Sequence, residues 1–167
     1  MGRARTRAEA PLAGVRQESQ AQASPRPESP ALGALAFTVY GSPVAQGRPR
    51  AARLPGGKIH IYNPASSRDW RQHVRVQALV ALGGRPRLLE GPLELTLSFE
   101  FARPKSAPKR RIWPDRRPDL GNCLKSCEDA LIGVAFRDDA QIVRMTLDKH
   151  YGPEPGVAIR LTPLSPQ

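Results

Sequence analysis

Apolar and polar residues alternate most regularly over residues 93–101, where leucine or phenylalanine occupies every second position. Glutamate, threonine and serine fill the positions between them. A period of two places the apolar side chains on one face of a β-strand, so this segment predicts a strand with one buried face. Shorter runs of strand composition predict four more strands, over residues 36–40, 58–62, 141–149 and 157–161.

A helix is predicted over residues 66–82, because apolar residues recur at helical spacing from Trp70 onward. Ser66 or Ser67 is the expected N-terminal cap, and two consecutive glycines end the segment. Residues 46–53 precede this helix and are rich in arginine. Their composition has poor helix potential, and we expect a basic loop there.

A second helix is predicted over residues 120–132, because its apolar and polar residues separate onto opposite faces. The apolar face is made of Leu120, Leu124, Cys127 and Leu131, and the polar face of Asn122, Lys125 and Asp129. This pattern indicates a helix that packs on the sheet through one side. An amide, an ammonium group and a carboxylate are left together on the other side.

These elements predict an α+β fold, in which a small single domain has a mixed β-sheet packed by two main helices. We assign residues 36–163 to this domain and residues 164–167 to a short tail. Residues 1–35 are rich in Ala, Arg, Pro, Ser, Gln and Glu and lack aromatic residues, so they predict a disordered N-terminal extension. That extension is either an arm that scans DNA or an upstream extension of the reading frame.

The charge of the chain narrows the range of functions. The sequence contains 26 Lys and Arg residues and 15 Asp and Glu residues, which gives a net charge of +11. A small protein this basic is typical of those that bind a polyanion. Seven of the cations lie within residues 103–117, at Arg103, Lys105, Lys109, Arg110, Arg111, Arg116 and Arg117. We interpret this segment, which also holds Trp113, as a phosphate-binding arm rather than a merely solvated loop. Arg48 and Arg50 are expected to add to the same DNA-binding surface.

Cys123 and Cys127 have no second pair of Cys or His at zinc-ligand spacing, so we interpret them as packing residues. The three histidines, His60, His73 and His150, are scattered and are expected to be structural. The chain has no signal-peptide pattern and no run of membrane-spanning length. We therefore expect a soluble cytoplasmic protein with no membrane partner.

Carboxylates gather at two points of this basic chain. Asp119 precedes the second helix, and Asp138 and Asp139 stand in a turn before the following strand. A helix cap at Asp119 and an ordinary ion pair between Lys125 and Asp129 would explain the helix alone. The second acidic point favours another interpretation, in which carboxylates hold a hard divalent cation for phosphodiester cleavage. Lys125 would then stabilise the charge that develops during the reaction.

The spacing of these charged residues resembles that of RusA-type Holliday junction resolvases. The matching segments are residues 117–125 (RPDLGNCLK), 129–131 (DAL) and 138–143 (DDAQIV), followed by Lys149. Residues 47–50 and 101–106 also resemble the family, so the resemblance covers residues 36–163. It implies a homodimer of small α+β subunits that binds four-way DNA junctions in recombination and repair, in a cell or in a prophage. It also implies that magnesium, or manganese in its place, assists the nicking of two opposed strands.

Matched by position, the resemblance implies that Asp119 and Asp139 are metal ligands and catalytic residues, with Asp138 as an additional ligand. It implies that Lys125 is the catalytic lysine, and that the site is supported by Asn122, Asp129 and Lys149. One position departs from the family pattern, because Gly121 stands where the family has an aspartate. Two alternatives to an active nuclease therefore stay open. One is a relative that binds branched DNA without cutting it, and the other is a basic structural nucleic-acid-binding protein.

Overall fold

The computed structural model describes residues 33–48, 50–53 and 55–165. Its elements are, in chain order, β1 (Leu35–Tyr40), β2 (Arg50–Arg53), β3 (Ile59–Tyr62), α1 (Ala65–Ala81), β4 (Leu93–Phe101), α2 (Leu120–Leu131), the 3-10 turn η1 (Asp139–Gln141), β5 (Ile142–Tyr151) and β6 (Gly156–Pro163). The predicted disordered extension falls almost wholly on residues 1–32, which lie outside the described residues. That part of the domain assignment stays a prediction.

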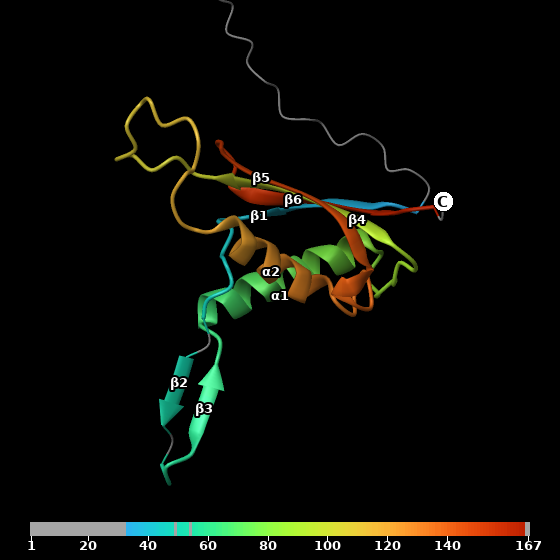
Figure 1. Ribbon diagram of the computed structural model, residues 1–167, viewed down its shortest axis with the longest axis horizontal. Coiled ribbons are helices and arrows are strands. Elements are labelled where there is room, and N and C mark those ends of the chain that lie inside the picture. Colours follow the sequence, from blue (N-terminus) through green and yellow to red (C-terminus); the bar gives the residue numbers. More distant parts are fainter. Residues whose placement is uncertain (1–32, 49, 54, 166–167) are drawn as a thin grey trace, which may run out of the picture.

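Four strands form one sheet in the order β1-β6-β4-β5. β4 runs parallel to β5 and antiparallel to β6, and β1 is antiparallel to β6, so the sheet is mixed. Figure 1 shows α1 and α2 on the same side of this sheet. The predicted α+β fold, a small domain with a mixed sheet and two main helices, is confirmed.

The core lies between the sheet and the two helices. Leu93, Leu95, Leu97 and Phe99 of β4 are fully buried, as their alternation predicted. Burying a side chain of this size stabilises the fold by roughly 1.5–3 kcal/mol. The other face of the sheet is polar, and there Ser98 donates a hydrogen bond to Asp148 over 2.8 Å. None of the helices in the described part of the chain is long and apolar enough to cross a membrane.

The N-terminus of α1 is not capped by a serine, contrary to the prediction. The helix begins at Ala65 after Pro64, and no side chain caps it. Ser67 is buried, and its hydroxyl accepts a hydrogen bond from Gly47 N (3.0 Å) and donates one to Ala45 O (3.1 Å). Because the loop before β2 lies within reach of this hydroxyl, Ser67 binds the backbone of the loop and not the first turn of the helix.

The prediction of a loop over residues 46–53 was wrong for its second half. Arg50–Arg53 forms β2, which pairs antiparallel with β3 as a separate two-stranded sheet. The turn between the strands contains Gly56 and Gly57 with φ of 88° and 81°, values that glycine adopts readily. Backbone pairing across this turn forms the hairpin, although β2 has no alternating apolar residues for sequence reasoning to detect.

Candidate active site

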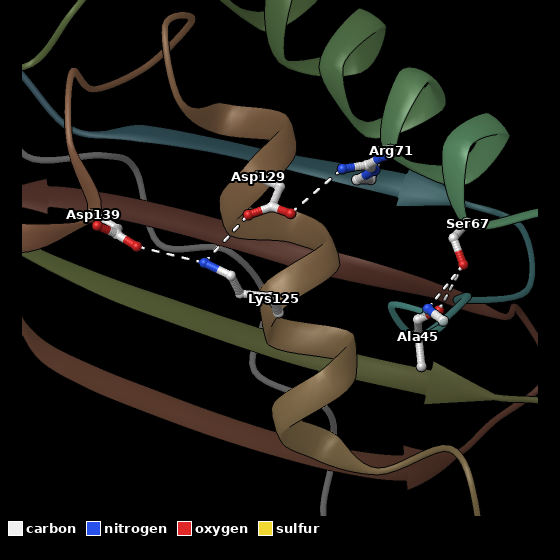
Figure 2. A network of polar contacts seen from close by, with 7 residues as sticks. Ala45, Ser67, Arg71, Lys125, Asp129 and Asp139 are labelled. Atoms are coloured by element: carbon white, nitrogen blue, oxygen red, sulfur yellow. Dashed lines mark hydrogen bonds and ion pairs between the residues drawn. The ribbon is translucent and has the colours of Figure 1, made fainter. Parts of the chain in front are cut away.

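Lys125 lies at the centre of the polar residues of α2, between two carboxylates. Its Nζ atom is 3.3 Å from Oδ1 of Asp129 and 3.5 Å from Oδ2 of Asp139 (Figure 2). Asp129 stands one turn further along α2, whereas Asp139 belongs to η1. The turn before β5 therefore folds back against α2, and two of the predicted catalytic residues are in direct contact.

A second cation, Arg71, binds the carboxylate of Asp129. Nη1 of Arg71, on α1, lies 3.4 Å from Oδ2 of Asp129, which thus binds cations from both helices (Figure 2). The hydrogen bond to Asp129 raises the pKa of Lys125 above its usual value, against a smaller opposing effect of burial. Lys125 is therefore a cation at neutral pH. It can neutralise negative charge but cannot act as a general base.

The acidic turn is held in place by Gln141, a residue that sequence reasoning missed. Oε1 of Gln141 accepts hydrogen bonds from the backbone nitrogens of Arg137 (2.8 Å) and Asp138 (3.2 Å). Oδ1 of Asp138 accepts one from Ala140 N over 2.8 Å, which completes a capping box. An aspartate followed three residues later by a glutamine resembles the signature of this box, so the sequence did carry a signal. Asp138 thus shapes the turn from which Asp139 projects.

Asp119 stands at the N-cap position of α2, but its side chain does not cap the helix. Its Oδ2 atom instead accepts a hydrogen bond from Nδ2 of Asn122 over 3.3 Å, and the carboxylate stays exposed. Lys149 fixes the backbone just before Asp119, because its Nζ atom donates hydrogen bonds to Arg116 O and to Pro118 O, each over 3.0 Å. The predicted supporting residues Asn122 and Lys149 therefore both act on the start of α2.

Two cysteines and a glutamate of α2 are buried. Burial raises the pKa of the Cys123 thiol to about 11, while the charge of Lys149 opposes this rise and that of Asp119 adds to it. Burial also raises the pKa of Cys127, so both thiols stay protonated at neutral pH, as packing residues should. Glu128 is 8% exposed and was not singled out from the sequence. It adds negative charge beside Lys125.

Glu128 gives a pH-dependent prediction, because burial raises its pKa above the ordinary 4.5. The folded chain then holds this proton more tightly than the unfolded chain. The free energy of unfolding consequently falls as pH rises from about 4.5 through the folded pKa. We expect Glu128→Gln to be more stable than the native chain at neutral pH, and the difference to vanish in acid. Urea unfolding of both chains across this range measures it, and a difference that stays constant with pH would contradict it.

The basic segment over residues 103–117 is a folded loop. Arg103 closes it by donating from Nη2 to Pro108 O (2.8 Å) and Lys109 O (3.1 Å), and Arg111 pairs with Asp115 over 3.2 Å. These two arginines thus serve the loop itself. Arg103 is exposed all the same, and the other exposed cations of the loop are Lys105, Lys109, Arg110, Arg116 and Arg117. A cavity of about 410 Å³ separates the loop from the ends of β4 and β5.

The carboxylates do not form a closed metal cage. Among the residues that the structure describes, no three of the types His, Cys, Asp and Glu are close enough to hold a metal ion together. Within the same residues, no hydrogen bond or ion pair joins Asp119 to Lys125 or Asp139. Gly121 lies on the exposed side of the first turn of α2, where a Cβ atom would meet nothing within 4 Å.

Comparison with known proteins decides the family. The family model described as endodeoxyribonuclease RusA matches residues 40–162 of the 167 in the chain. The chain belongs to the RusA endodeoxyribonuclease family. The RusA match contains α2, η1 and Lys149, and so all of the candidate site residues. A curated protein of Bacillus subtilis (strain 168), called uncharacterized protein YqaN, is 37% identical over 142 residues, which cover 78% of this chain and 97% of that protein.

Membership of the RusA family has direct consequences for the class of activity. Its members are nucleases that cleave DNA, and the RusA type acts on branched junctions. The basic loop and the contact between Lys125 and Asp139 lie inside the matched segment. Family membership therefore favours a nuclease over the basic structural protein that charge alone allowed.

Proposed function

We propose that this chain is a Mg²⁺-dependent endonuclease that resolves four-way DNA junctions by paired symmetric nicks. The observation that carries the proposal is the contact between Lys125 and Asp139 over 3.5 Å. It joins a cation of α2 to a carboxylate of η1, two segments separated by the end of the helix and the following turn. Phosphodiester cleavage needs this combination of carboxylate oxygens and a cation facing one phosphate.

The donor set fits Mg²⁺ better than a softer metal, because the groups available are carboxylate oxygens. Mg²⁺ commonly takes one or two protein carboxylates and completes its coordination with water and substrate phosphate. Asp119 and Asp139 would hold it, and Asp138 has a second oxygen, Oδ2, beside the one that caps η1. When bound, the ion would polarise the phosphate and lower the pKa of a bound water.

The side chains then have separate tasks. Lys125 carries the positive charge that offsets the charge growing on the phosphate oxygens, and its raised pKa keeps it protonated. Asp129, which Arg71 binds in turn, holds the ammonium group in place from the side opposite Asp139. Asn122 orients the carboxylate of Asp119, and Lys149 positions the backbone before it. Hydrolysis adds water across one phosphorus–oxygen bond and leaves a phosphate and a hydroxyl at the nick.

The basic residues supply affinity for the junction. The exposed cations of residues 103–117, together with Arg48 and Arg50, would bind backbone phosphates near the site. A homodimer would place two such sites about a twofold axis, which suits a four-way junction of similar symmetry. One chain has one site, and two opposed nicks therefore call for two chains.

The substrate is tested with a mobile four-way junction and a linear duplex of the same sequence, each labelled on one strand at a time. The expected result is paired nicks at symmetric positions in the junction, with the duplex uncut at the same protein concentration. Equal affinity for both DNAs, with neither cut, would refute the proposal.

Gly121 supports a second candidate function. It removes one carboxylate from the family pattern, and among the described residues no three side chains of His, Cys, Asp or Glu are grouped closely enough to hold a metal ion. A chain with this deficit would bind junctions selectively and leave them intact. Selective binding without nicks in the same experiment would favour this function over the first.

A further inference from the structure

We propose that the β2–β3 hairpin is a DNA-binding arm that holds a duplex arm of the junction outside the active site. This inference rests on the proposed function and extends the phosphate contacts proposed for Arg48 and Arg50 to the rest of the hairpin. The contact region includes Arg53 and Lys58, to which the family pattern gave no role. The ligand is the phosphate backbone of double-stranded DNA.

Positive charge is concentrated in and around the hairpin. Residues 41–68 contain five Lys or Arg residues and no Asp or Glu. Arg50, Arg53 and Lys58 of the hairpin and Arg48 before it are exposed. Cations elsewhere in the fold, such as Arg71 and Arg144, have carboxylate partners. Within the described residues none of the four exposed cations has an ion pair, so their charge is available to phosphate.

The hairpin projects from the rest of the domain. Figure 1 shows β2 and β3 extending away from the sheet and helices, and their strand pairing in the described residues is with each other alone. A two-stranded hairpin without further packing is marginally stable in water. Arg50, Ala51 and Arg53 of β2 are exposed, and Ile59 of β3 is 68% exposed, so these side chains pack little against the domain. A binding partner would stabilise it, and the charge selects a polyanion.

The base of the arm is fixed against both helices, which gives the arm a defined direction. Gln46 N donates to Asn122 O over 2.8 Å, in the first turn of α2. Gly47 N donates to the buried Ser67 of α1, and a Cβ atom at position 47 would come within 2.8 Å of Cγ of Pro64. DNA that reaches Asp119 and Lys125 therefore passes close to where the arm leaves the domain.

The arm and the basic loop lie at the same end of the domain. Figure 1 shows residues 103–117 projecting on one side of the start of α2 and the hairpin projecting on the other. Each four-residue strand spans about 13 Å, since a strand rises about 3.3 Å per residue. Duplex DNA carries a phosphate charge about every 1.7 Å of its axis, so the arm is long enough to meet several phosphates. Loop and arm would thus bind the DNA on both sides of the cleavage site.

The test uses the full chain with Arg53→Gln and Lys58→Gln together, two exposed changes outside the proposed active site. We expect junction affinity to fall roughly tenfold at physiological salt, and the slope of log K against log salt to lose about two units. Hydroxyl-radical footprinting should show protection lost over one segment of a junction arm and retained at the crossover. Arg85→Gln with Arg87→Gln is the matched control, because these exposed arginines lie beyond the other end of α1. The control should bind as the native chain does.

Three results distinguish a failure of the inference about the hairpin from a failure of the proposed function. Native affinity, salt slope and footprint in the Arg53 and Lys58 variant would overturn the inference alone, provided that the native chain binds junctions. A native chain without selective junction binding would overturn the proposed function, and the inference with it. A loss of dimer mass in sedimentation of the variant, without a change in salt slope, would assign the arm to a second copy of the chain. Arg53→Lys with Lys58→Arg, which keeps both charges, should restore binding.

Discussion

Replacing Asp139 by Asn is expected to remove junction nicking while junction affinity stays the same or rises. The change deletes one proposed metal ligand and breaks the ion pair to Lys125. Removing one preorganised group that stabilises the transition state costs an enzyme on the order of 10²–10³ in rate, and we expect a loss of at least this size here. Binding should not suffer, because removing a carboxylate reduces repulsion of the DNA backbone. Asp119→Asn should act in the same way. Single-turnover nicking and a binding titration at fixed salt measure both effects.

Asp148→Asn is the matched control for both changes. Asp148 is a half-exposed carboxylate of β5, but it faces the polar side of the sheet, where it binds Ser98 and His150. Its removal should leave the nicking rate near that of the native chain. A rate that falls equally in all three variants would assign the loss to the fold. A native rate in Asp139→Asn would eliminate Asp139 as a catalytic residue.

Gly121→Asp is expected to increase the rate of nicking, by about tenfold or more. A Cβ atom fits at this position without contact, and a carboxylate in the first turn is favoured by the helix dipole. The new carboxylate would stand two residues after Asp119 and one turn before Lys125, where it can add a metal ligand. Supporting groups at metal sites commonly change affinity or activity by about 10–100-fold. The gain should be largest at low magnesium concentration.

Gly121→Ala distinguishes the effect of the new carboxylate from the effect that replacing glycine has on the stability of the helix. Alanine in place of an exposed helical glycine stabilises by about 0.5–1 kcal/mol, so this variant should unfold at a higher temperature. Its nicking rate should stay close to that of the native chain. If Ala and Asp increased the rate equally, the gain would come from a firmer helix, and the missing ligand would not explain the native activity.

Periodicity made much of the fold predictable. Leu93, Leu95, Leu97 and Phe99 alternate because one face of β4 is buried and the other is polar, and burial is the property that such a pattern records. The two helices were predicted for the same reason, and the observed bounds of α2 differ from the prediction by one residue. The contact between Lys125 and Asp139 joins residues that were both assigned to the site from the family resemblance.

Other features depend on contacts that no local pattern records. Ser67 precedes an apolar helical run and looks like a cap, but the position of Ala45 and Gly47 decides what its hydroxyl binds. Glu128 falls at the edge of the apolar face of α2, and its burial depends on how the helix packs. The hairpin strand β2 consists of arginine and alanine, so its formation depends on pairing with β3 and leaves no apolar alternation.

A divalent cation held at Asp119 and Asp139 is expected to enable this chain to cut a junction. The most direct measurement follows one labelled strand of a mobile four-way junction at a time, with the native chain in magnesium and in EDTA. We predict paired symmetric nicks in magnesium, no nicks in EDTA, and no nicks by Asp139→Asn in either condition. Nicks that persist in EDTA, or that Asp139→Asn makes at the native rate, would contradict a metal-dependent cut at these two residues.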